Sequence, residues 1–212
     1  MPEGLGVLLQ GVVLGFAIAA PVGPIGLLCI RRTLQHGPAM GLATGLGAAV
    51  ADTFYGAVAA FGLQAVIEWM AGHEGLFRLF GGIFMLAVAI RGAVATSRPQ
   101  PGADGPPDPA GLAANFATGL VLTMGNPLTI MAFVAVLAAF GLGGQLGRFD
   151  AATLVAGVFA GSAAWWLLLN SGVAVMRHRI TDGWFAAVNR IAAVLLAGCG
   201  LYALVTAVLA LA

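Results

Sequence analysis

Charged side chains are scarce in this sequence. Asp, Glu, Lys and Arg together make up 8% of the 212 residues, whereas hydrophobic residues make up 60%. Soluble domains carry roughly 25% charged residues, and a chain with so few cannot cover a folded surface in contact with water. The composition therefore excludes a soluble globular protein and predicts that lipid surrounds most of the chain.

Residue types that carry chemistry are also rare or absent. Lysine is missing, and a net charge of +1 leaves no basic face for nucleic acid. Cys29 and Cys199 lie in apolar stretches without a CxxC pair, which favours small core residues over redox or metal chemistry. The three histidines lack metal-ligand spacing, and no nucleotide-binding or hydrolase motif occurs. We therefore expect no metal, no cofactor and no enzymatic activity.

The few charges interrupt the apolar sequence at the interval that membrane-spanning helices require. A helix needs ~20 apolar residues to cross the hydrocarbon layer, and its internal hydrogen bonds satisfy the backbone in lipid. The charge-poor stretches predict six helices, and they lie at about 5–30, 39–67, 76–96, 112–140, 152–176 and 191–210. The predicted fold class is an all-α integral membrane protein with six transmembrane helices.

The arginines predict how the chain is oriented in the membrane. Seven of the nine fall in or beside the loops after the first, third and fifth helices, and these are Arg31, Arg32, Arg91, Arg98, Arg177, Arg179 and Arg190. Only Arg78 and Arg148 fall on the other side. Because cytoplasmic loops are enriched in basic residues, we expect both termini to lie outside, in the periplasm.

Residues 97–111 are the one stretch that resembles a soluble segment. They hold five of the ten prolines, together with Asp104 and Asp108, and predict a cytoplasmic Pro-rich linker. The linker separates a first three-helix repeat, 1–96, from a second, 112–212. Because three is an odd number, the second repeat is expected to be inverted relative to the first, as in several transporter folds.

Both halves contain an interruption at a corresponding place. Pro21-Val22-Gly23-Pro24 interrupts the first helix, and Gly125-Asn126-Pro127 interrupts the fourth. Prolines remove amide donors and glycine loosens the backbone. A simple packing kink would explain one such motif, but paired interruptions indicate a binding site near the membrane midplane. The freed amides at a half-helix N-terminus favour an anion such as a substrate carboxylate.

Asp52 is the one charged residue within the second predicted helix. A carboxylate near the membrane centre costs at least ~2.5–3.5 kcal/mol, so it is expected to face the bundle interior. Gly41, Gly45 and Ala48 share its helix face and form a smooth seam. Asp52 is a candidate for binding a substrate amine or a coupling proton; the alternative is a protonated carboxyl that joins two helices.

Two further features of the helices have mainly structural interpretations. The glycines at four-residue spacing, which are Gly37, Gly41, Gly45, Gly157 and Gly161, predict close helix packing. Trp165 and Trp166 lie too deep in their helix for an interfacial belt. Packing is the first interpretation for both, and a cavity wall is the alternative for one.

At these residues the sequence resembles the lysine-exporter (LysE/RhtB) family of bacterial amino-acid efflux proteins. The resemblance is carried by residues 21–26 with Arg31 and Arg32, by the glycines leading to Asp52, and by Asn126-Pro127. It implies a proton- or exchange-driven exporter in the inner membrane. Transferring the family's site residue by residue implies that the substrate contacts Gly23, Pro24, Asp52, Asn126 and Pro127. The first-helix motif departs from the family pattern, since Val22 precedes Gly23 and Ile25 takes a usually polar position.

The sequence thus predicts a secondary transporter that exports an amino acid or a similar small metabolite. The expected partners are a small-molecule substrate and the lipid bilayer, without nucleic acid, and a homodimer is left open. A small-ion or metal-ion permease of similar architecture is the alternative function. A membrane-embedded enzyme would need several ionisable groups at membrane depth, where the sequence offers only Asp52.

Overall fold

The computed structural model describes residues 3–21, 23–61, 73–94, 108–126, 129, 147–176 and 182–211. Within them the chain is helical and contains no strand, which confirms the all-α class. The seven helices are α1 (Glu3–Ala19), α2 (Pro24–His36), α3 (Pro38–Ala60), α5 (Glu74–Val94), α6 (Pro109–Met124), α8 (Arg148–Met176) and α9 (Asp182–Leu211).

Three of the described helices are long and apolar enough to cross a membrane. They are Pro38–Ala60, Arg148–Met176 and Ala186–Val208, and the bent pair of α1 and α2 makes four if it counts as one span. Helices α5 and α6 contain shorter apolar stretches, Arg78–Ile90 and Pro109–Met124. The chain is therefore a multi-pass membrane protein. The prediction of six spans stays open, since the predicted second and fourth helices continue into residues outside the described ones.

The first predicted helix is two helices. The axes of α1 and α2 differ by 81° across the Pro21–Gly23 interruption, so this motif breaks the helix rather than kinking it. The break also corrects the expectation that Arg31 and Arg32 lie in a loop, because α2 continues through both to His36. Arg31 is 8% exposed.

Two other helix boundaries differ from the sequence expectation. Helix α9 begins at Asp182, so Arg190 lies inside a helix and not in front of one. Helix α6 begins at Pro109, within the predicted linker, because the Asp108 carboxylate accepts hydrogen bonds from the amides of Ala110 and Gly111. An Asp N-cap followed by proline is a strong start signal. Linker residues 97–107 lie outside the described part of the chain.

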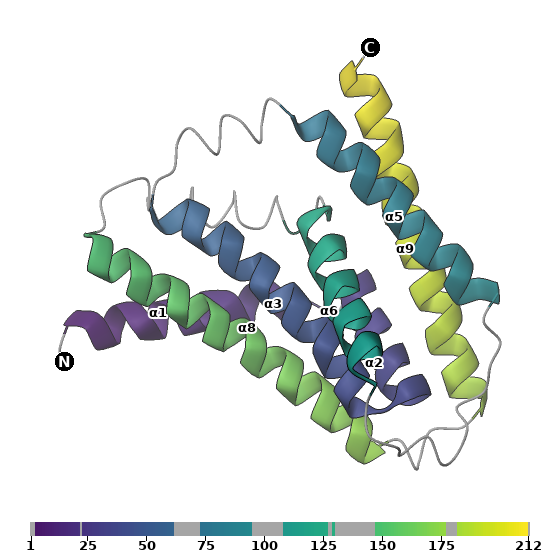
Figure 1. Ribbon diagram of the computed structural model, residues 1–212, viewed down its shortest axis with the longest axis horizontal. Coiled ribbons are helices and arrows are strands. Elements are labelled where there is room, and N and C mark those ends of the chain that lie inside the picture. Colours follow the sequence, from purple (N-terminus) through teal and green to yellow (C-terminus); the bar gives the residue numbers. More distant parts are fainter. Residues whose placement is uncertain are drawn as a thin grey trace.

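The helices pack in pairs (Figure 1). Helix α1 lies along α8, α3 lies along both α6 and α8, and α5 pairs with α9 at one side of the molecule. The short helix α2 lies among these elements and contacts α3, α8 and α9. Eight of its thirteen residues are buried. The helix that follows the break therefore occupies the interior.

Glycines allow the two closest helix contacts. A Cβ on Gly47 of α3 would overlap the carbonyl oxygen of Phe116 on α6, and a Cβ on Gly161 of α8 would overlap that of Val12 on α1. A Cβ on Gly157 would likewise overlap the carbonyl oxygen of Leu8. The packing role that the sequence predicts is confirmed for Gly157 and Gly161 but is wrong for Gly37, where a Cβ would meet no atom within 4 Å.

Candidate functional site

A cavity of about 160 Å³ lies where the break between α1 and α2 meets α3, the end of α6 and α8. Four of the five predicted site residues line it, and they are Gly23, Pro24, Asp52 and Asn126. The fifth, Pro127, lies outside the described residues. Residues that are 103 positions apart in the sequence, such as Gly23 and Asn126, therefore line the same cavity.

The start of α2 forms one side of the cavity. Gly23 is its N-cap with extended backbone (φ −93°, ψ −164°), no side chain caps it, and Pro24 occupies the first turn. Proline favours this position because its fixed φ suits the helix and its missing N–H would be unpaired there anyway. The amides of a first helical turn have no preceding helical carbonyl. Ile25 and Gly26, which carry such amides, also line the cavity.

The end of α6 forms another part of the cavity wall. The helix stops at Met124, whose carbonyl oxygen accepts a 2.6 Å hydrogen bond from the Tyr55 hydroxyl of α3. Gly125 follows, and a Cβ there would lie 2.7 Å from the Cα of Gly81 on α5. A tyrosine thus satisfies one of the carbonyls that a helix end leaves unpaired, and a glycine lets α5 approach. Asn126 beyond it is 7% exposed.

Asp52 lies on the α3 wall and is 3% exposed, which confirms that it faces the protein interior. Ser162 of α8 donates a 2.7 Å hydrogen bond to its Oδ2. Ala48, one turn earlier on the predicted seam, also lines the cavity. Asp52 therefore faces the cavity and joins α3 to α8, and its role in binding a substrate amine or a proton stays a prediction.

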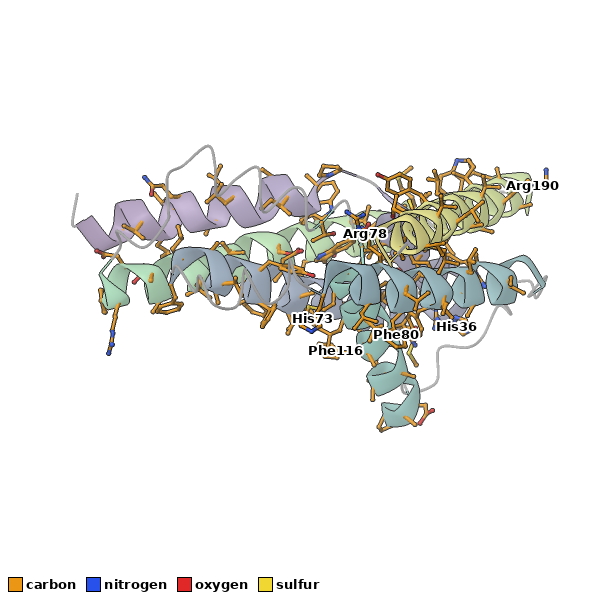
Figure 2. All side chains as sticks on the ribbon, turned by 90° about the horizontal axis from the view of Figure 1, so that it is seen from above. His36, His73, Arg78, Phe80, Phe116 and Arg190 are labelled. Carbon is orange, nitrogen blue, oxygen red and sulfur yellow. The ribbon has the colours of Figure 1, made fainter. Side chains whose placement is uncertain are left out.

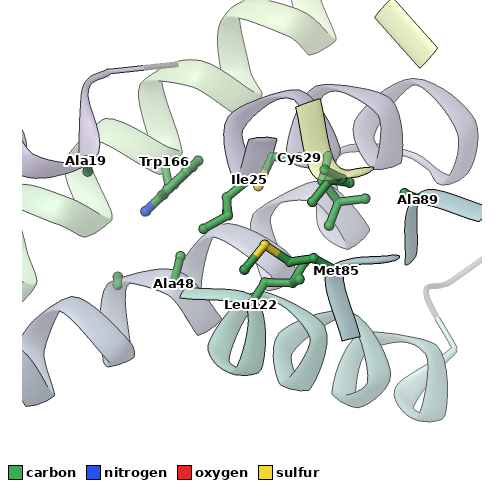
Figure 3. Close-up of a cluster of buried hydrophobic side chains, with 11 residues drawn as sticks. Ala19, Ile25, Cys29, Ala48, Met85, Ala89, Leu122 and Trp166 are labelled. Carbon is green, nitrogen blue, oxygen red and sulfur yellow. The ribbon is translucent and has the colours of Figure 1, made fainter. Parts of the chain in front are cut away.

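Ser162 and Thr123 at the site were not predicted, whereas a cavity wall was the alternative predicted for Trp165 or Trp166. Ser162 holds Asp52, while Thr123 and Trp166 line the cavity and are 3% and 4% exposed. The depth of Trp166 in its helix was a usable signal for a cavity wall. Gly45 explains its position, because a Cβ there would lie 2.7 Å from the Trp166 Cβ. In Figure 3 the indole nitrogen of Trp166 lies on the side of Ala19 and Ala48, two cavity residues.

A second polar cluster lies further along α2. Arg32 donates a hydrogen bond to the side-chain oxygen of Asn115 on α6, and Thr33 donates one to the side-chain oxygen of Asn170 on α8. The Asn170 amide in turn donates to the Trp166 carbonyl oxygen at 2.8 Å. These bonds tie α2 to both α6 and α8 on the side away from the break.

A larger hollow of about 670 Å³ lies between α5 and α6. Its wall is almost entirely apolar, with Leu76, Phe80, Ile83 and Met124 among its residues, and it contains none of the predicted site residues. His73 and Phe80, which line it, are labelled in Figure 2. Its chemistry is that of a lipid-facing surface, so the smaller cavity at the helix break is the candidate site.

A cavity at a broken helix that holds one buried carboxylate, in a multi-pass helical membrane protein, is an arrangement typical of membrane translocators. The LysE type translocator model matches residues 16–207 of the chain. The protein is therefore a member of the LysE type translocator family. This confirms the resemblance drawn from the sequence and agrees with the expectation of no enzymatic activity.

One curated relative is a membrane protein of Escherichia coli (strain K12). It is the uncharacterised membrane protein YahN, 27% identical over 154 residues, which cover 73% of this chain and 69% of that protein. No solved structure matches the chain.

Proposed function

We propose that this translocator exports an amino acid or a similar small metabolite across the bacterial inner membrane, driven by proton antiport or by exchange. The observation that carries the proposal is the convergence of Gly23, Pro24, Asp52 and Asn126 on one buried cavity. Buried ionisable groups inside membrane proteins are characteristic of substrate and proton pathways. Export is the direction that membership of the family favours.

The two poles of an amino acid have partners in this cavity. The uncapped first turn of α2 offers amides and the positive end of the helix dipole to the substrate carboxylate. The Asp52 carboxylate binds the substrate ammonium or, in the alternate step, the coupling proton. The side chain of Asn126 supplies an uncharged donor and acceptor at the end of α6.

Contacts that recur with constant spacing support an inverted repeat. The recurring contacts are Gly47 with Phe116 and Thr44 with Gly119 in the pair α3–α6, and Gly161 with Val12 and Val158 with Gly15 in the pair α8–α1. Gly161 and Val158 follow Gly47 and Thr44 by 114 positions each. Phe116 and Gly119 follow Val12 and Gly15 by 104 positions each. In our proposal, rocking of the two halves about the cavity alternates its access.

The proposal is tested with the purified protein in liposomes under an imposed pH gradient. Asp52→Asn is expected to abolish the stimulation of amino-acid transport by the gradient. The control is Asp150→Asn, since Asp150 is an acid of the first turn of α8 outside the cavity and is half-buried. Unchanged coupling and unchanged substrate affinity in Asp52→Asn would refute the role of Asp52. Transport of divalent cations without amino-acid transport would favour the metal-ion permease instead.

A further inference from the structure

Two buried donors face the candidate cavity without a partner. The Trp166 indole Nε1 and the Thr123 hydroxyl have no hydrogen-bond partner among the described residues, although both residues are more than nine-tenths buried. Buried polar side chains in folded proteins are almost always hydrogen-bonded. Since both residues line the cavity, the missing acceptor belongs inside it.

The neighbouring Trp165 differs from Trp166 in its position relative to the cavity. Its indole nitrogen is also buried and unpartnered, but Trp165 does not line the cavity. Its ring packs edge-on against Phe16, with ring centroids 5.4 Å apart. Trp165 therefore offers a matched control for any role of Trp166 inside the cavity.

The spacings of the recurring helix contacts relate residues of the two halves of the chain that line the cavity. Residues of α8 follow their equivalents on α3 by 114 positions, so Trp166 is equivalent to Asp52. Residues of α6 follow their equivalents on α1 by 104 positions, so Thr123 is equivalent to Ala19. All four residues line the cavity. Equivalent positions thus carry an anion in the first half of the chain and neutral N–H and O–H donors in the second. The two halves contribute different chemistry to the same cavity.

We propose that Trp166 and Thr123 bind the substrate carboxylate in the cavity that also contains Asp52, and that the substrate is a small α-amino acid with an uncharged side chain. This inference rests on the proposed function and adds its substrate class and two binding residues. The indole N–H and the Thr123 hydroxyl donate to the carboxylate beside the first turn of α2. The substrate ammonium lies at Asp52, whose other partner is Ser162.

The charges of the cavity wall set the class of side chain. Asp52 is the one charged residue that lines the cavity among the described residues. Once the substrate ammonium has bound it, a second cation on the substrate has no carboxylate to meet. A second anionic group on the substrate would lie against apolar residues near Asp52, without a basic side chain to pair with. Both arrangements are unfavourable because an unpaired charge is strongly disfavoured away from water.

The volume of the cavity suits a short substrate. At ~30 Å³ per water molecule, the 160 Å³ of space has room for about five waters. Alanine, serine and similar amino acids match this size. The remaining wall includes Ile18, Ile25 and Ala48, which suits a short side chain without charge.

The test is counterflow into liposomes that contain the purified protein. Uptake of radiolabelled glycine, alanine, serine, lysine and glutamate is measured together with competition by alaninamide, which keeps the ammonium and lacks the carboxylate. The wild type is expected to transport the neutral amino acids at least tenfold better than lysine or glutamate. It is also expected to prefer alanine strongly over alaninamide.

Trp166→Phe and Thr123→Val remove one donor each and keep most of the side-chain volume. Each is expected to raise the KM for alanine about tenfold and to narrow the preference for alanine over alaninamide. Trp165→Phe is expected to change neither quantity. A loss of folding alone would lower activity equally for alanine and alaninamide, so the ratio reports the carboxylate contact.

The outcomes separate the two proposals. If no amino acid is transported by the wild type, the proposed function fails. If amino acids are transported but both variants keep the wild-type ratio of alanine to alaninamide, the assignment of Trp166 and Thr123 is overturned. Preferred transport of lysine or glutamate would overturn the substrate class.

Discussion

Ser162 of α8 donates a 2.7 Å hydrogen bond to the carboxylate of Asp52 on α3, across 110 positions of the chain. Both residues are at most 3% exposed. The bond joins the two halves of the protein at Asp52, the one charged residue of the cavity among those that the structure describes. Removing it changes both the stability of the fold and the environment of Asp52.

Ser162→Ala is expected to destabilise the protein by about 1.5–3 kcal/mol, the usual range for a hydrogen bond to a charged group. Chemical unfolding in detergent measures this change. Ser171→Ala is the control, because Ser171 lies exposed on the same helix and should change stability by less than about 0.5 kcal/mol. Equal effects of the two substitutions would show that the bond to Asp52 contributes nothing.

Gly161→Ala is expected to be strongly destabilising, since its Cβ would overlap the backbone of Val12 on α1. We expect a loss of about 1–3 kcal/mol or more, as for overpacked cores. Gly172→Ala on the same helix meets no atom within 4 Å and should be neutral or stabilising by up to ~1 kcal/mol, because alanine favours helices. Thermal unfolding in detergent compares the two. A stable Gly161→Ala protein would contradict the tight contact between α1 and α8.

Arg32 and Asn115 are expected to be energetically coupled, because the Arg32 guanidinium donates to the Asn115 side chain. Arg32→Gln and Asn115→Ala should each lower the free energy of unfolding. The loss in the double variant should be smaller than the sum of the two single losses by about 0.5 kcal/mol or more. A double-mutant cycle on unfolding in detergent measures this coupling. Arg148→Gln paired with Asn115→Ala is the control, since Arg148 is exposed at the start of α8. Additive losses in both cycles would argue against the bond between α2 and α6.

Both termini are expected in the periplasm, from the placement of the arginines. Alkaline phosphatase fused after residue 212 should be active in cells, and a fusion within residues 97–111 should be inactive. A fluorescent protein that matures only in the cytoplasm should give the opposite pattern at the same two positions. The reversed result at both sites would invert the proposed orientation and, with it, the side from which substrate enters.

Much of the candidate site could be predicted because it depends on local chemistry. A carboxylate in an apolar helix has to be buried, so Asp52 could be placed from the sequence alone. Proline and glycine interrupt helices through their own geometry, so the breaks at Gly23 and after Met124 were also visible. The 81° angle at the first break was not, because a kink and a complete break share one sequence pattern.

The errors come from contacts between distant segments. Arg32 was expected in a loop because charge usually ends a membrane helix, but its contact with Asn115, 83 positions away, lets α2 continue. Likewise, the presence of Thr123 and Trp166 in the same cavity as Asp52 depends on which faces of α3, α6 and α8 meet. The periodicity of one helix shows which face is buried but does not identify its partner.

The pairing of α1 with α8 has a consequence for biosynthesis. Helix α1 ends at Ala19, whereas α8 begins only at Arg148. At about 5–20 residues per second, the ribosome needs on the order of ten seconds to produce the surface on which α1 packs. During that delay the face of α1 that carries Gly15, which later packs on α8, can contact only lipid or the insertion machinery. A truncated product that stops before α8 would leave α1 without its packing partner. The unpacked helix would then distinguish an incomplete chain from a complete one.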